Sequence, residues 1–298
     1  MKSHYQHLLK PEILHSLKGL ELASKVIVDS FLAGLNKSSR VGSGMEFSQY
    51  RSYEPGDDLR LLDWKMLARS ERYYIKQADL ETNITVKFII DASKSMLEQP
   101  DELVKMDYTR VAVASLAFLA QHQGDAIGLF ALNDQDFYNL YPRISKRHFN
   151  RFLQYLLDIK NEGKWPTNPV ETEKLHDRRH KELIIVFTDM YEYEHELSDF
   201  LFRLKTKRNE VVVFHVISEK ERLLQYKGPI TFESLETGER KKVDVNTVRR
   251  DYINTFSDRI DALRSAMLEN GIDYQLFNVD NDVKQVLQSF LKKRNALL

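Results

Sequence analysis

Short apolar runs alternate with helical segments from residue 84 to the end of the chain. Each run is brief, rich in β-branched or aromatic side chains and almost free of charge, which is typical of a strand buried on both faces. The runs are residues 84–90, 126–132, 183–187, 211–217 and 274–279. Strands separated by helices pair through crossover connections. The pattern therefore predicts an α/β fold with an open, mostly parallel sheet and helices on both faces.

Apolar residues at three- and four-residue spacings predict the helices around these strands. These helices are residues 11–36, 103–122, 149–157, 197–205, 248–267 and 283–291. Gly271 follows the long helix 248–267 as its expected C-terminal cap. Turn signals at Gly228 and Gly238 interrupt the alternation and predict a small β insertion within residues 220–246.

The composition excludes several classes of function. Lys+Arg and Asp+Glu both count 44, so the chain lacks the overall basic field that non-specific nucleic-acid binding uses. There is no cysteine, which excludes disulfides, thiolate metal sites and cysteine nucleophiles. No stretch approaches the roughly 18 apolar residues that a membrane helix needs, and residues 1–18 lack the apolar core of a signal peptide. We therefore expect a cytoplasmic protein with no membrane span and no nucleic-acid partner.

Oxygen-bearing side chains follow two of the predicted strands. Asp91, Ser93 and Ser95 come directly after the first strand, and Asp189 comes after the third. Thr167 lies in the loop that precedes the third strand. Ligands bind to open α/β sheets where the strands reach their carboxyl ends. We therefore expect these five side chains to converge at one end of the sheet.

Such a set of oxygens suits a hard divalent cation, Mg²⁺ first of all, or another such as Mn²⁺ or Ca²⁺. Three hydroxyls and only two carboxylates would leave the ion short of negative charge. An acidic side chain from a protein partner would then be a favoured last ligand. The alternative is structural: Ser93 and Ser95 would cap the next helix while Asp91 accepts from loop amides. Thr167 also has polar neighbours in its loop that could take its place.

These residues resemble the metal-ion-dependent adhesion site of von Willebrand factor A domains. The matching features are Asp-x-Ser-x-Ser at residues 91–95, the distant Thr167, and the Thr-Asp pair that ends at Asp189. The resemblance implies that Ser93, Ser95 and Thr167 bind the ion directly. It also implies that the two aspartates bind directly or through water, and that a partner's Glu or Asp completes the coordination.

A second signature precedes the first strand. Residues 40–76 read RVGSGMEFSQYRSYEPGDDLRLLDWKMLARSERYYIK. This segment resembles the hallmark of the family called domain of unknown function 58, which are bacterial von Willebrand factor A-like proteins. The resemblance extends to residues 236–239 and 271–274. It implies a MoxR-type AAA+ ATPase as partner and a role in chaperone-like maturation or assembly of other proteins.

Acidic and basic residues alternate with aromatic residues in this signature. Arg51, Asp58, Arg60 and Asp63 are the central charges, and Trp64 follows them. The spacing predicts an internal ion-pair network above a packed Trp64, which would fix this segment as a scaffold. The alternative is a solvent-facing surface that binds a partner.

We expect three parts in the chain: a helical segment 1–36, a signature module 37–82 that packs with the insertion 220–246, and a von Willebrand factor A-like domain 83–298. The expected function is a divalent-cation-dependent protein-interaction module and not an enzyme. The competing class is a Mg²⁺-dependent phosphohydrolase or nuclease that uses the Asp91/Asp189 cluster.

Overall fold

The chain divides into two compact units in the computed structural model. One unit comprises Met1–Phe31 with Ile84–Leu298, and the other comprises Leu32–Asn83. The first of the two boundaries along the chain falls within a helix, α2 (Leu17–Ser38), and the second falls at residues 83/84. The structure describes residues 8–38, 49–52, 67, 69, 72–77, 84–99, 103–167, 175 and 181–297.

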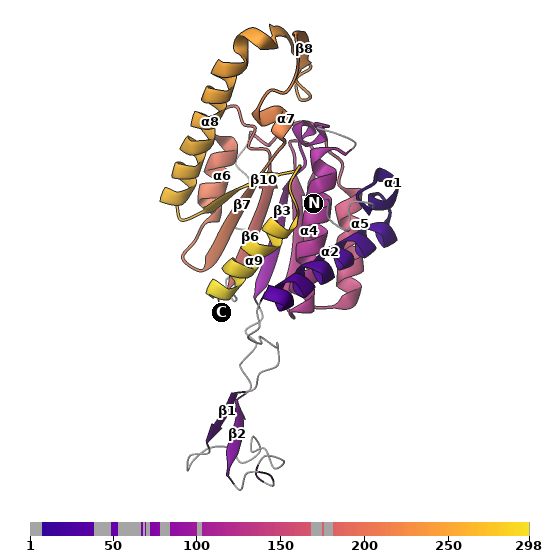
Figure 1. The fold of residues 1–298 in the computed structure, drawn as a ribbon, viewed down its shortest axis with the longest axis vertical. Coiled ribbons are helices and arrows are strands. Elements are labelled where there is room, and N and C mark those ends of the chain that lie inside the picture. The colour runs from indigo at the N-terminus through magenta and orange to yellow at the C-terminus, as the bar shows by residue number, and fades with distance from the viewer. Residues whose placement is uncertain are drawn as a thin grey trace. The chain divides into compact units, whose positions relative to one another are not determined.

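A six-stranded sheet forms the centre of the larger unit (Figure 1). Its strands are β3 (Thr85–Asp91), β4 (Ala126–Leu132), β5 (Phe137–Arg143), β6 (Glu182–Thr188), β7 (Asn209–Ile217) and β10 (Asp273–Asn278). Their order across the sheet is β10-β7-β6-β3-β4-β5, and every neighbouring pair is parallel except β4 with β5. The predicted α/β fold with an open and mostly parallel sheet is confirmed.

The central strands β3 and β6 are buried along their whole length, as their apolar sequences predict. Lys87 is a charged residue in the middle of the otherwise largely apolar strand β3. It pairs with the buried Glu182 of the neighbouring strand β6 and donates to the carbonyl of Leu175. A buried charge is tolerated when it is paired and hydrogen-bonded in this way.

The edge strand β5 was not predicted from the sequence. Only Leu140 of its seven residues is buried, so the strand lacks the continuous apolar run of its neighbours. It also contains Pro142, which has no amide hydrogen to donate and is therefore confined to edge strands or bulges. The antiparallel pairing of β5 with β4 closes one side of the sheet.

Helices cover both faces of the sheet (Figure 1). α6 (Glu196–Leu204) and α8 (Val245–Glu269) pack on one face, where Phe200, Leu204 and Ile260 join the core with β6 and β7. The helices of the other face are α1 (Pro11–Leu14), α2, α4 (Lys105–His122), α5 (Lys146–Asp158) and α9 (Lys284–Leu297). The predicted helix 11–36 is therefore two helices, which separate at His15 and Ser16.

The predicted β insertion is a two-stranded hairpin. β8 (Pro229–Glu233) pairs antiparallel with β9 (Arg240–Asp244), the short helix α7 (Glu219–Arg222) precedes them, and α8 follows directly. Gly238 has φ +71° in the connecting turn, which is a conformation that favours glycine. Gly271 likewise has φ +70° just after α8, as expected for a C-terminal cap.

In the smaller unit, β1 (Gln49–Ser52) pairs antiparallel with β2 (Tyr74–Gln77). The predicted network of Arg51, Asp58, Arg60 and Asp63 concerns side chains outside those described. The packing of the signature module against residues 220–246 stays a prediction. In the described ranges, none of the helices has the length and apolar character needed to cross a membrane.

Candidate functional site

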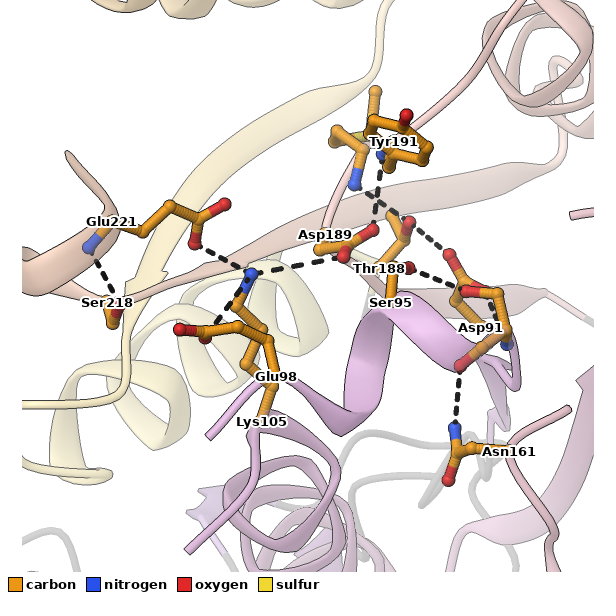
Figure 2. A network of polar contacts seen from close by, with 12 residues as sticks. Asp91, Ser95, Glu98, Lys105, Asn161, Thr188, Asp189, Tyr191, Ser218 and Glu221 are labelled. Carbon is orange, nitrogen blue, oxygen red and sulfur yellow. Dashed lines mark hydrogen bonds and ion pairs between the residues drawn. The ribbon is translucent and has the colours of Figure 1, made fainter. Parts of the chain in front are cut away.

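The candidate site lies where the order of the strands reverses, at the carboxyl ends of β3 and β6. β3 connects to β4 on one side, and the chain later returns to place β6 on the other side. Asp91 is the last residue of β3, and Thr188 is the last of β6. Figure 2 shows these two side chains beside Ser95 and Asp189. The structure therefore brings together residues that lie almost a hundred positions apart.

Asp91 is completely buried at the centre of this group. Its Oδ1 accepts from the Ser93 amide at 3.0 Å, and its Oδ2 accepts from the Thr188 hydroxyl at 2.7 Å. Burial, followed by repulsion from Asp189, raises the pKa of Asp91 to about 7, although the hydrogen bonds from Ser93 and Thr188 oppose the shift. The two hydrogen bonds therefore hold the carboxylate in a fixed orientation. Its surroundings carry too little positive charge to stabilise the ionised form.

The two serines lie next to this carboxylate. Ser93 Oγ and Ser95 Oγ are 2.9 Å apart, with Ser93 buried and Ser95 partly exposed. Ser93 precedes the 3-10 turn η3 (Lys94–Leu97), but its side chain makes no capping hydrogen bond there. The prediction that Ser93 caps this helical turn is therefore wrong. The accompanying prediction, that Asp91 accepts a hydrogen bond from a loop amide, is confirmed.

The loop after α5 fixes the backbone that carries the serines. Asn161 Nδ2 donates to the Ser93 carbonyl at 3.2 Å, and the Lys94 amide donates to the Gly163 carbonyl at 3.1 Å. Thr167 lies further along this loop, where its exposed side chain lines a hollow with Tyr193 and Glu196. That hollow is separate from the cavity lined by Ser95 and Asp189, and the role of Thr167 as a ligand stays a prediction.

A buried lysine faces Asp189 from the first turn of α4. Lys105 is 1% exposed, and its Nζ lies 2.7 Å from Glu221 Oε2, 3.8 Å from Glu98 Oε2 and 3.9 Å from Asp189 Oδ2 (Figure 2). Burial alone would lower the pKa of Lys105, but the three carboxylates outweigh burial and the pKa is raised. Sequence reasoning missed this residue, although a lysine opening so apolar a helix is a detectable signal.

The turn of the β8–β9 hairpin contributes a further carboxylate, Glu236, which sequence reasoning also missed. Its half-buried side chain lines the same cavity as Ser95 and Asp189. Burial first, then repulsion from Asp189 and Asp91, raises the pKa of Glu236 to about 7, although the nearby Ser95 and Tyr193 side chains oppose the shift. Its Oε2 is buried and has no hydrogen-bond partner among the described residues.

An open cavity of about 360 Å³ adjoins the site. Ser95, Asp189 and Glu236 supply part of its polar lining, and aromatic and aliphatic side chains of α8, among them Phe256 and Leu263, supply an apolar wall. The cavity therefore presents carboxylates and hydroxyls next to an apolar surface, which is an arrangement suited to a polar ligand with an apolar neighbour.

The donor chemistry of the site fits a hard cation. The site offers two adjacent serine hydroxyls, the buried Asp91 carboxyl with its raised pKa, and Glu236 Oε2, which has no hydrogen-bond partner among the described residues. Oxygen atoms of these kinds are what a hard cation binds. In the described part of the chain, no three His, Cys, Asp or Glu side chains are grouped closely enough to hold a metal by themselves. A cation here would therefore depend on the serine hydroxyls and on water, and not on a cage of carboxylates.

Comparisons with known proteins place the chain in a wider group. The family described as "Protein of unknown function DUF58" matches residues 49–260. The uncharacterized proteins Mb1516 of Mycobacterium bovis and Rv1480 of Mycobacterium tuberculosis are each 22% identical to the chain over 253 residues, which is 81% of this chain and 76% of theirs.

Two solved structures are similar to the chain over 72% of its length and 100% of theirs. BatB from Bacteroides thetaiotaomicron has a TM-score of 0.49 at 13% identity. An aerotolerance-related membrane protein from Bacteroides fragilis has a TM-score of 0.48 at 14% identity.

Proposed function

The chain belongs to the DUF58 family, and from this membership and the geometry at the ends of β3 and β6 we propose that it is a divalent-cation-dependent protein-interaction module. Ser93 and Ser95 would hold one Mg²⁺, or Mn²⁺ or Ca²⁺ in its place. Asp91 and Asp189 would bind the ion directly or through water, with Thr167 as a further hydroxyl ligand. A protein partner would complete the coordination with an acidic side chain.

One observation carries the proposal: Asp91 is fully buried beside Asp189, next to two hydroxyls that touch each other. Two neighbouring carboxylates disfavour each other's ionised form, and burial increases that cost. A divalent cation would remove both penalties at once. Because the chain supplies few charges to the ion, we expect modest affinity and an open position for one more anionic ligand.

The surrounding residues support the site by fixing its geometry. The Ser93 amide and the Thr188 hydroxyl orient both oxygens of Asp91, and the loop that contains Asn161 holds the serine backbone in place. Lys105 balances Asp189 from the other side. A site held in this way before the ion binds loses little conformational freedom when it binds.

A binding role is favoured over the phosphohydrolase or nuclease alternative. A catalytic carboxylate must reach the reacting atoms. Asp91 has no exposed surface and the side chain of Asp189 is 6% exposed, so both carboxylates could hold a small ion but neither is placed to act on a substrate as a base or nucleophile. We expect no Mg²⁺- or Mn²⁺-dependent hydrolysis of a generic phosphodiester above the background of an Asp91→Asn variant.

By family resemblance, we propose that a MoxR-type AAA+ ATPase is the partner and that the pair acts in maturation or assembly of other proteins. The test is a pull-down of a purified MoxR-type ATPase from the same genome with the full chain, in Mg²⁺ and in chelator. Binding in Mg²⁺ alone, and its loss in Ser95→Ala, would support the proposal. Ser257→Ala, an exposed serine of α8, is the matched control. Binding that is equal in chelator and in Ser95→Ala would contradict it.

A further inference from the structure

We propose, on the basis of the function proposed above, that the β8–β9 hairpin closes the cation site from within the chain. Glu236 would take the coordination position that a partner's carboxylate must occupy. The hairpin would then be a built-in competitor, and a partner would bind by displacing it.

The position of Glu236 gives the first argument. The hairpin lies beyond the carboxyl ends of the strands, next to the start of α8 (Figure 1). Its turn brings Glu236 into the lining of the cavity that Ser95, one of the two predicted hydroxyl ligands, also lines. Glu236 also lines the same cavity as Asp189. A carboxylate from a docked partner would have to lie at this same place.

The surroundings of Glu236 give the second argument. Its carboxylate lines one cavity with that of Asp189, which in turn lies beside Asp91 (Figure 2). One oxygen of Glu236 is buried without a hydrogen-bond partner among the described residues. A buried acceptor without a partner is costly, and a third carboxylate beside two others is more so. A cation between Ser95 and Glu236 would account for both features.

The construction of the hairpin gives the third argument, because it permits movement. Side chains of β8 alternate between exposed and half-buried, and those of β9 are exposed except for Val243. The described packing of the hairpin includes the contact between Tyr226 and Phe232. An element with so little buried apolar surface can separate from its domain at low cost. Leu235, which is 46% exposed, lines the cavity next to Glu236 and would move with it.

Closure would lower the apparent affinity for any partner in proportion to the fraction of molecules that are open. Removing Glu236 should therefore have opposite effects on two ligands. Affinity for the cation should fall severalfold, because one anionic ligand is lost. Affinity of the cation-loaded protein for an external carboxylate should rise by about tenfold or more, because the competitor is gone.

The experiment uses Mn²⁺ bound to the full chain and measures the relaxation of water protons, which reports the number of waters bound to the ion. Glu236→Ala should add one water to bound Mn²⁺, and millimolar acetate should then displace that water. The wild-type chain should show the lower water count and little response to acetate. Glu239→Ala, an exposed glutamate of the same turn, is the control and should behave as the wild type. Glu236→Gln keeps the size of the side chain, and it should change the water count and the acetate response in the same direction as Glu236→Ala does.

The outcomes separate the two proposals. If Mn²⁺ binds at one site in the wild type, and neither Glu236 variant changes the water count or the acetate response, the hairpin does not close the site and this inference is overturned. If the wild type binds no Mn²⁺, or binds it equally after Ser93→Ala with Ser95→Ala, the cation site itself is wrong and both proposals are overturned.

Discussion

At the scale of single residues, Asp91 is the group whose buried carboxyl should couple the stability of the fold to pH. Its pKa is about 7 in the folded chain against 3.8 for an ordinary aspartate. The folded state therefore binds the proton more tightly than the unfolded state, so this group favours folding fully below pH 3.8 and loses that contribution as the pH rises to about 7. Without a cation, ionised Asp91 weakens the fold at neutral pH.

The first prediction follows from this loss of stability as Asp91 ionises. Asp91→Asn removes the charge but retains one oxygen acceptor. At pH 8 in chelator, we expect the variant to be more stable than the wild type by about 2 kcal/mol. The shifted pKa of Asp91 alone would give a larger difference, but the substitution also weakens one hydrogen bond. At pH 4 the advantage should vanish. Mg²⁺ should raise the melting temperature of the wild type alone. A variant less stable than the wild type at pH 8 would show that Asp91 serves the fold more than the ion.

The second prediction concerns His215, which is buried on β7 in contact with Tyr274. Burial first, then Lys105 and Arg259, lowers its pKa from 6.5 to about 3. The unfolded state takes up the proton first, so stability should fall as the pH drops from about 6.5 toward 3, by about 1.4 kcal/mol per pH unit. Urea unfolding at several pH values should show a flatter profile for His215→Gln. The exposed His122→Gln should keep the wild-type slope, and an unchanged slope in His215→Gln would contradict the assignment.

At the scale of elements, the first turn of α4 brings the positive charge of Lys105 to one side of the site. Lys105 lies among Glu98, Asp189 and Glu221 with almost no exposure. The third prediction is that Lys105→Met destabilises the metal-free protein by about 1–3 kcal/mol, because it leaves three partly buried carboxylates without their positive partner. Mg²⁺ should restore more stability to this variant than to the wild type, since it brings back positive charge.

The control for this variant is Lys94→Met, which changes an exposed lysine of η3. Thermal unfolding with and without Mg²⁺ measures both variants. If Lys105→Met is as stable as the control in chelator, the carboxylates around Lys105 do not depend on it.

Elements were predictable from the sequence to the extent that they are buried. The central strands carry continuous apolar runs, so β3, β4, β6 and β7 were found close to their observed bounds. The edge strand β5 was missed because it is half-exposed and contains Pro142. The hairpin was predicted from its turns, but the approach of Glu236 to Ser95 was not, because no local pattern reports a contact across 141 positions.

At the scale of the whole molecule, the sheet topology explains which site residues could be predicted together. Asp91 ends β3 and Asp189 directly follows β6, and parallel neighbouring strands place their ends at the same edge. Thr167 lies in a loop that no such rule positions, and it lines a different hollow. The supporting residues Thr188 and Asn161 act through hydrogen bonds that depend on the folded geometry.

The central claim is that the ends of β3 and β6 hold one divalent cation, and a Mn²⁺ titration of the full chain followed by electron paramagnetic resonance tests it most directly. We predict one saturable Mn²⁺ per chain, displaced by Mg²⁺. Binding should be lost when Ser93→Ala is combined with Ser95→Ala and should be retained in Ser257→Ala. The absence of saturable binding to the wild type, or binding of equal strength in the double variant, would contradict the account.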